Sequence, residues 1–413
     1  MKKIFVFSIF LILISFSIST TKVANAVLAP SVIYTYKSSL QDISCTGNNC
    51  VAVGNNVILQ SVNKGVTWKI VLSKKISSPN DGSNLMDVDC ISTTCVAVGG
   101  GATIVKSSDG GKNWKIIDNF LVALNANSFT SSISGVSCID KNICYAIGKN
   151  FHNGGDLTKF SSAFGTVILK TTDGGLTWNA NKIEKAVFNY PLPSLLPTLD
   201  SSRFELKYTI NDEFPLHFIK KILCKNEMEC FGIGAQRSIF HTTDGWKTAT
   251  LQQFKIDDPV KVLTNGANDF NSSAYVVDGN IVNTPQKVAR YDFSGISFTG
   301  DGGVIVEDMG DGTHYIFKST DNGNTWNSIN TPLTSSARNS GGRISCVGST
   351  CVIVAQNLSA KKVDILTSLD NGNIWKATAF KKVTSIEGTS CIDSNNCFAV
   401  GDTIPKGVVI KVK

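Results

Sequence analysis

The sequence predicts an all-β repeat fold, in which a unit of four antiparallel strands recurs along the chain. One eight-residue segment appears six times, and each copy is flanked by runs rich in β-branched and aromatic residues. A second feature, two cysteines with four or five residues between them and short apolar runs on either side, precedes most copies. The copies of the first segment are residues 61–68, 107–114, 171–178, 242–249, 319–326 and 368–375. Together they indicate one repeated unit rather than several different domains.

The eight-residue segment is typical of a tight turn between two strands. Its third residue can accept backbone N–H bonds inside the turn, its fifth is usually a glycine that tolerates positive φ, and its eighth is usually a tryptophan that packs on a neighbouring unit. In the fourth copy Trp246 replaces the glycine and Ala249 replaces the tryptophan, so we expect a looser corner there. We expect the third-position residues to be structural rather than catalytic: Asn63, Asp109, Asp173, Asp244, Asp321 and Asp370.

The cysteine pairs are predicted to form disulfides across short hairpins. Polar loops between the two cysteines bring their Cα atoms within reach of each other. A zinc site would require cysteines from several loops to converge, which successive units of a repeat do not favour, so no metal is expected. The pairs use all 12 cysteines: Cys45/Cys50, Cys90/Cys95, Cys138/Cys144, Cys224/Cys230, Cys346/Cys351 and Cys391/Cys397.

The repeated turn resembles the Asp box, S-x-D-x-G-x-T-W, of sialidase-type β-propellers; residues 319–326, STDNGNTW, show the match. The same box occurs in sortilin-like receptors, in two-propeller xyloglucanases and in propeller factors that assist photosystem II assembly. The resemblance implies one β-propeller of four-stranded antiparallel blades. It is closest in kind to the assembly-factor propellers, which bind a partner chain and carry out no chemistry.

Counting the units predicts a single seven-bladed ring over residues 27–413. Units begin near Leu40, Leu85, Ile133, His217, Ser294, Arg343 and Ser385. The last unit lacks its fourth strand, whereas residues 31–37 resemble a fourth strand that has no first, second or third strand before it. We therefore expect residues 31–37 to pair with residues 408–413 and to close the ring. An eight-bladed ring is the alternative, with a degenerate blade hidden in residues 260–292.

The first 26 residues have the pattern of a signal peptide. Lys2 and Lys3 precede an apolar stretch, and small residues at 24–26 suit cleavage near Ala26, which predicts a secreted or periplasmic protein of bacterial type. An uncleaved signal anchor is the alternative. Removing these residues lowers the formal charge from +7 to +4, and no basic run with interleaved aromatics indicates nucleic acid. We expect a monomer with no stable membrane insertion and no cofactor.

The direction of the strands sorts the connections between two faces. The cysteine hairpins and the repeated turns fall on one face, and the long segments fall on the other: residues 119–132, 149–165, 181–216, 254–293 and 331–342. Long loops on a rigid scaffold often bind ligands, although their aromatic residues could equally tether the loops to the scaffold. The candidates for a binding face are His152, Lys159, Phe160, Tyr190, Arg203, His217, Arg290 and Tyr291. The acidic residues Glu307, Asp308 and Asp311 could hold a cation, although a solvated turn is the more common arrangement.

The arginines argue against a sialidase. The resemblance would require three arginines around a substrate carboxylate, one of them before the first box, yet no arginine occurs among residues 1–202. The five arginines are Arg203, Arg237, Arg290, Arg338 and Arg343, and lysine does not replace a bidentate guanidinium. The sequence therefore favours a non-catalytic propeller that binds a protein or glycan partner. A sialidase-type glycoside hydrolase is the alternative, and the low arginine content also departs from the arginine-rich surface of the assembly factors.

Overall fold

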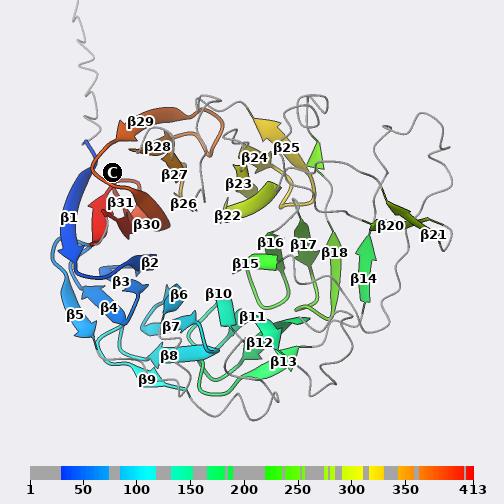
Figure 1. The fold of residues 1–413 in the computed structure, drawn as a ribbon, viewed down its shortest axis with the longest axis horizontal. Coiled ribbons are helices and arrows are strands. Elements are labelled where there is room, and N and C mark those ends of the chain that lie inside the picture. Colours follow the sequence, from blue (N-terminus) through cyan, green and yellow to red (C-terminus); the bar gives the residue numbers. More distant parts are fainter. Residues whose placement is uncertain are drawn as a thin grey trace, which may run out of the picture.

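The computed structural model shows a seven-bladed β-propeller with no helix among its described residues, seen down its central channel in Figure 1. It describes residues 29–73, 84–117, 132–151, 165–181, 185–188, 219–234, 238–251, 254–255, 274–277, 280–283, 291–309, 316–329, 343–357, 362–403 and 406–413. The prediction of an all-β ring of four-stranded antiparallel blades is confirmed.

Each blade is a meander that runs from the channel outward. Blades 1 and 2 consist of β2 (Leu40–Thr46), β3 (Asn49–Gly54), β4 (Val57–Ser61), β5 (Lys69–Leu72), β6 (Leu85–Ile91), β7 (Thr94–Gly99), β8 (Thr103–Ser107) and β9 (Lys115–Ile116). Blades 3 and 4 consist of β10 (Ser132–Cys138), β11 (Cys144–Phe151), β12 (Gly165–Thr171), β13 (Asn179–Asn181), β15 (Ile219–Cys224), β16 (Cys230–Gly234), β17 (Ile239–Thr242) and β18 (Thr248–Leu251).

The remaining three blades follow the same order. Blades 5 and 6 consist of β22 (Tyr291–Thr299), β23 (Gly302–Met309), β24 (Ile316–Ser319), β25 (Trp326–Ile329), β26 (Arg343–Val347), β27 (Thr350–Asn357), β28 (Lys362–Ser368) and β29 (Lys376–Phe380). Blade 7 consists of β30 (Ser385–Asp393), β31 (Asn396–Asp402), β32 (Gly407–Lys411) and β1 (Ser31–Tyr36).

The N-terminal strand closes the ring. β1 pairs antiparallel with β32, with Val32 opposite Ile410 and Tyr36 opposite Gly407, and so supplies the outer strand that blade 7 lacks. The first and last strands of the described chain therefore share one sheet. This confirms the pairing expected between residues 31–37 and 408–413.

Two segments expected as loops instead contribute strands. β14 (Lys185–Phe188) adds to the outer strand β18 of blade 4, and β19 (Phe254–Lys255) adds to β25 of blade 5. Both additions are parallel, unlike every other pairing in the ring. Within residues 260–292, the described part before β22 forms only the two-stranded sheet of β20 (Ala274–Val277) and β21 (Asn280–Asn283). The eight-bladed alternative is therefore wrong.

All six predicted disulfides are present. Each joins two residues directly opposite each other at the turn between the first and second strands of a blade, with Cα atoms 4.0 or 4.1 Å apart. Blade 5 has Phe298 and Gly303 at the equivalent pair and no disulfide. The described residues contain no free cysteine. The bonds are Cys45–Cys50, Cys90–Cys95, Cys138–Cys144, Cys224–Cys230, Cys346–Cys351 and Cys391–Cys397.

The disulfides reach further into the core than their polar hairpin loops suggest. The second cysteine of every pair is fully buried, and several belong to the apolar clusters between blades. Cys50 packs in the cluster that joins blades 7 and 1, and Cys351 packs in the cluster that joins blades 5 and 6. These sulfur atoms therefore contribute to packing as well as to cross-linking, and none of the buried cysteines is available to a ligand. The buried members are Cys50, Cys95, Cys144, Cys230, Cys351 and Cys397.

The repeated turns are built as their composition predicts. In the turn of blade 2, Ser107 donates to the Asp109 carboxylate at 2.8 Å, and that carboxylate accepts the backbone N–H of Asn113 at 2.9 Å. The Trp114 indole N–H donates to the carbonyl of Gly111 at 3.0 Å, which folds the ring back over the turn. These bonds are local and close the turn without a contribution from the rest of the ring. The same pair of bonds to the third residue recurs at Asn63, Asp173, Asp244, Asp321 and Asp370.

The turn of blade 4 differs from the looser corner that its sequence predicts. Its carboxylate, Asp244, still accepts the Thr248 N–H at 2.9 Å. Trp246 adopts a positive φ of 66° and is fully buried in the apolar cluster between blades 3 and 4. It therefore occupies space that the tryptophan missing at Ala249 would otherwise fill, although its indole N–H has no hydrogen-bond partner.

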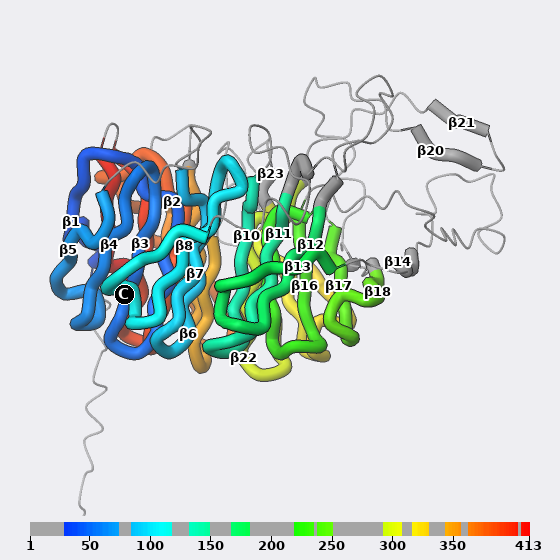
Figure 2. Tube along the Cα trace, turned by 90° about the horizontal axis from the view of Figure 1, so that it is seen from below, coloured from blue at the N-terminus to red at the C-terminus, as the bar shows by residue number. Residues whose placement is uncertain are grey.

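The hydrophobic core lies between the blades. Seven clusters of buried side chains each join neighbouring sheets, for example Val51 of blade 1 with Val105 of blade 2, and Phe231 of blade 4 with Phe317 of blade 5. Stacking sheets face to face in this way buries a continuous apolar surface that no single blade could bury alone. Figure 2 shows the stacked blades from the side.

The disulfide turns and the repeated turns share one face of the ring, because both connect strands that end on the same side. We call this the turn face. The connections between blades leave and re-enter on the other side, the connection face, where the innermost strands begin. Most residues of these connections lie outside the described residues, so the prediction that they form a binding surface stays a prediction.

Each disulfide by itself is expected to stabilise the folded ring. Replacing Cys391 and Cys397 together by alanine should lower the free energy of unfolding by about 2 kcal/mol, because a short closed loop removes about that much entropy from the unfolded chain. Urea denaturation of the oxidised proteins measures the difference. The difference should become smaller when both proteins are fully reduced, because only the packing contribution of the two side chains then remains. A difference of the same size under reduction would show that the disulfide adds nothing beyond packing.

Candidate functional site

The innermost strands of the seven blades line a central channel. Along each of them, one residue faces the apolar core between blades while its two neighbours face the channel. The core-facing residues of blades 1 to 6 are Ile43, Val88, Val136, Ile222, Ile296 and Ile344, all buried; Thr389 holds the equivalent position in blade 7. The channel-facing residues form two layers, one nearer the turn face and one nearer the connection face, and these layers make up the candidate site.

The layer nearer the turn face is a belt of hydrogen bonds between blades. The N–H of a residue at the inner edge of one blade donates to a side chain of the preceding blade: Cys90 to Ser44 at 3.0 Å, and Cys138 to Asp89 at 2.7 Å. An inner edge strand would otherwise leave these N–H groups without a partner. The belt side chains are Ser44, Asp89, Ser137, Ser297, Ser345 and Ser390, and they bridge six of the seven junctions.

The seventh junction, between blades 4 and 5, is held differently. Leu223 occupies the belt position and cannot accept a hydrogen bond, and Phe298 replaces the cysteine of the next blade. An aromatic cluster fills the space: the Phe231 ring lies 4.7 Å from the Phe298 ring, and Lys225 Nζ lies 4.9 Å above the Phe298 ring. Dispersion and cation–π attraction therefore take the place of the belt bond at this junction.

His241 belongs to this aromatic cluster. Its ring stacks on Phe231 at 4.2 Å, and its Nε2 lies 3.2 Å from the carboxylate of Glu229. Burial lowers the pKa of His241, although Glu229 opposes the shift. The residue lies in β17, as the sequence predicts for a strand residue beside a repeated turn. It acts as a packed structural residue.

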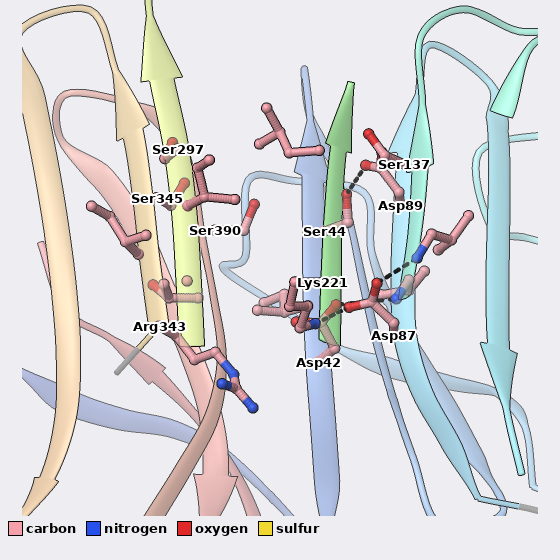
Figure 3. Close-up of a pocket in the computed structure, with 18 of the residues that line it drawn as sticks. Asp42, Ser44, Asp87, Asp89, Ser137, Lys221, Ser297, Arg343, Ser345 and Ser390 are labelled. Carbon is pink, nitrogen blue, oxygen red and sulfur yellow. Dashed lines mark hydrogen bonds and ion pairs between the residues drawn. The ribbon is translucent and has the colours of Figure 1, made fainter. Parts of the chain in front are cut away.

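The layer nearer the connection face carries charge. Asp42 accepts the Val88 N–H at 3.1 Å, and Asp87 accepts the Val136 N–H at 2.7 Å, so these two carboxylates also join neighbouring blades. Lys221 of blade 4 reaches Asp87 of blade 2 and forms an ion pair with it (Figure 3). Blades 2 and 4 are not adjacent, so this side chain spans part of the channel.

Arg343 lies in the same layer on another side of the channel (Figure 3). Its Nε donates to the carbonyl of Glu387 in blade 7, and its Nη1 donates to the carbonyl of Ser294 in blade 5 at 3.2 Å. The guanidinium is thus fixed by backbone groups of the blades on both sides. A charged group held in this way is oriented before any ligand arrives.

Beyond this layer the channel opens into a cavity on the connection face. The cavity has a volume of about 410 Å³, and Lys220, Lys221, Asp292, Arg343 and Glu387 are its charged lining residues. Lys220 and Asp292 form an ion pair with each other. A second cavity of about 240 Å³ lies deeper in the channel and shares Lys221, Ser294 and Arg343 with the first. We call the outer cavity the channel mouth.

The charges along the channel are not evenly distributed. Asp42, Asp87 and Glu387 come from blades 1, 2 and 7, which are consecutive around the closed ring. The basic residues come from blades 4 and 6. One side of the channel is therefore acidic and the other mainly basic, with Asp292 of blade 5 as the exception. A polarised concave surface of this kind suits a ligand that presents both charges and hydrogen-bonding groups.

Burial changes the protonation of the channel carboxyls. It raises the pKa of Asp89 to about 6, although the hydrogen bond from the Cys138 N–H opposes the shift. Burial and the neighbouring carboxyl of Asp87 raise the pKa of Asp42 well above its usual range, and Lys221 opposes this. Burial also raises the pKa of Glu387, while the charge of Arg343 lowers it.

Seven of the eight predicted binding-face residues are not among the residues that the structure describes. His152, Lys159, Phe160, Tyr190, Arg203, His217 and Arg290 lie outside the described residues, and Tyr291 is the first residue of β22. Their assignment to a binding surface stays a prediction. Of the candidate cation ligands, Glu307 is buried in β23, Asp308 also lies in β23, and Asp311 is outside the described residues. The described part of the chain contains no group of three or more metal-ligating side chains.

The sequence contained a signal for the belt that the repeat analysis did not use. The residue before the first cysteine of each pair is serine or aspartate in five of the six pairs, the exception being Leu223. The mouth residues Lys220, Arg343 and Glu387 carry no such signal, because different residue types occupy equivalent positions in the other blades.

Comparison with known proteins supports the fold. The solved structure of YCF48 bound to D1 peptide is similar with a TM-score of 0.54 and 14% identity, over 93% of this chain and 94% of that one. YCF48 from Cyanidioschyzon merolae is similar with a TM-score of 0.54 and 15% identity, over 93% and 98%. No family model matches the sequence, and no curated protein matches it. Among the described residues, no helix has the length and apolar character to span a membrane. At these identities the likeness establishes a propeller fold and nothing finer.

The channel carboxyls predict a specific dependence of stability on pH. The raised pKa of Asp89 means that the folded protein holds a proton between about pH 4 and pH 6 that the unfolded chain releases, so this group's contribution to stability falls as pH rises through that range. Asp89→Asn keeps an acceptor for Cys138 without the charge. It should raise the free energy of unfolding at pH 7.5 by about 2 kcal/mol and have little effect at pH 4.

Asp109→Asn is the matched control. Hydrogen bonds from Asn113 and Ser107 outweigh the effect of burial and lower the pKa of Asp109 to about 2, so this substitution should destabilise the protein at pH 7.5. Chemical denaturation at the two pH values measures both effects. A loss of stability at pH 7.5 in Asp89→Asn would show that the belt requires a charged carboxylate.

Proposed function

We propose that this protein is an exported, non-catalytic β-propeller that binds a protein partner at the channel mouth. The observation that carries the proposal is the mouth itself, a cavity of about 410 Å³ on the connection face that is lined by charged side chains of both signs. Side chains from several blades converge there, and one of them, Arg343, is fixed in place by backbone carbonyls.

The roles of the channel carboxyls support binding rather than catalysis. Asp42, Asp87 and Asp89 accept backbone N–H groups of the following blade, and each therefore has a structural task. An acid or base in a reaction must be free to exchange its proton with a substrate. The absence of arginine from residues 1–202 further disfavours a sialidase-type reaction. A glycan could use the same polar cavity, but charged anchors of both signs favour a protein.

The comparisons add one relevant parallel. YCF48, which shares the propeller fold at 14% identity, has been solved bound to D1 peptide. A role resembling that of an assembly factor would fit a propeller that holds a partner chain. Export is supported by the six disulfides, because such bonds persist in oxidising compartments. A signal peptide over residues 1–26 would supply the route.

The proposal is tested by selecting peptides for binding and locating their site. Random dodecapeptides displayed on phage are panned against the wild-type protein, and selected peptides are measured by fluorescence anisotropy. Lys220→Ala and Glu387→Gln should each weaken binding about tenfold, because they remove charges at the mouth. Lys64→Ala is the matched control, since it also removes one exposed ion pair but lies on the turn face.

Two results would contradict the proposal. Peptides that bind the mouth variants as well as the wild type would place the binding surface elsewhere. Hydrolysis of a fluorogenic sialoside that is lost in Arg343→Ala would favour the glycoside hydrolase. Thermal denaturation of each variant shows whether a loss of binding reflects the mouth or a failure to fold.

A further inference from the structure

The outer edges of two neighbouring blades show how this ring accepts an additional strand. β14 pairs in parallel with β18, from Lys185 opposite Thr248 to Phe188 opposite Leu251. β19 pairs in parallel with β25, with Phe254 opposite Trp326. In both blades the first residue of the added strand lies opposite the end of the repeated turn: Lys185 is opposite the seventh residue, Thr248, and Phe254 is opposite the eighth, Trp326. The geometry for adding a fifth strand is therefore present twice in the same molecule.

The outer strand of blade 6 has the same geometry and no fifth strand in the described residues. β29 (Lys376–Phe380) is the last strand in its sheet and lies on the outside of the ring (Figure 1). Four outer strands follow a repeated turn and have no fifth strand beside them in the described residues: β5, β9, β13 and β29. β29 is the longest of them, with 5 residues against 4 in β5, 2 in β9 and 3 in β13. The next segment, residues 381–384, is a short described turn that leads directly to β30.

The side chains of β29 leave its backbone accessible. Lys376, Ala377, Thr378 and Ala379 are all exposed, and three of these four are small. Apart from the ladder to β28, no backbone hydrogen bond involves residues 376–380 in the described part of the chain. Unpaired N–H and C=O groups along an exposed edge are a template for an extended chain.

The charge at this edge indicates the kind of partner. Lys376, Lys381 and Lys382 are exposed, and no described carboxylate lies within ion-pair distance of them. Three lysines along one edge disfavour pairing with the same edge of a second copy, because like charges would then face each other. The same lysines attract an acidic chain.

We propose that β29 is a docking strand for an extended acidic segment of a partner protein, which adds to blade 6 in parallel as a fifth strand. The incoming strand would begin opposite Ile374 or Trp375, by analogy with the registers of β14 and β19. Backbone hydrogen bonds provide the affinity and the three lysines provide the preference for acidic side chains. This site lies on the outer rim and does not depend on the function proposed for the channel mouth.

A blocked heptapeptide of alternating threonine and glutamate tests the proposal on the full-length protein. Its binding is measured by fluorescence anisotropy, and protection of the amides of residues 376–380 is measured by hydrogen exchange with and without peptide. The triple variant Lys376→Glu, Lys381→Glu and Lys382→Glu should weaken binding about tenfold or more, since three exposed charge contacts become repulsive. The substitutions are on exposed side chains, and thermal denaturation confirms folding.

Two controls separate strand addition from general attraction of charge. Lys69→Glu, Lys112→Glu and Lys115→Glu reverse three exposed charges at the outer rim of blades 1 and 2 and should leave binding unchanged. A peptide of the same sequence with alternate amides N-methylated should not bind. Absence of binding to the wild type, equal binding by the methylated peptide, or protection only of residues outside 374–380 would overturn the proposal. Self-association of the protein through this edge would overturn it as well.

Discussion

The structure depends on how the inner edge of each blade finds hydrogen-bond partners. In a propeller the first strand of every blade faces the channel with one edge unpaired, and seven such edges converge around one axis. Here the preceding blade supplies a serine or aspartate side chain that accepts one of these N–H groups at six junctions. The bonds run in one direction around the ring, so each blade is oriented by the blade before it.

Closure of the ring makes this arrangement possible. The belt bond between Ser390 of blade 7 and Cys45 of blade 1 joins residues 345 positions apart, at the junction where β1 completes blade 7. The disulfides and repeated turns act locally and hold each blade in shape. The belt and the N-terminal strand act over long range and hold the blades to one another. The local contacts within blades and the long-range contacts between blades together position the charged groups at the mouth.

Much of the architecture could be predicted from the sequence because it is encoded in repeats. The spacing of residues such as Cys90 and Cys95, and of Asp109 and Trp114, fixes turns through local chemistry. The unpaired strand at residues 31–37 then predicted closure. The mouth could not be predicted, because Lys221 meets Asp87 only through the closed ring, across a sequence separation of 134. The added strands β14 and β19 were also missed, since a parallel partner for an outer strand has no periodic signal.

The junction between blades 4 and 5 provides the sharpest test of the belt, because Leu223 leaves the N–H of Phe298 without the side-chain acceptor found elsewhere. Native-state hydrogen exchange compares the amide of Phe298 with the equivalent amides of Cys45, Cys90, Cys138, Cys224, Cys346 and Cys391. The belt predicts that these six exchange only with global unfolding and that Phe298 exchanges faster. Exchange of Phe298 as slow as that of the other six would show that the side-chain belt does not protect the inner edges.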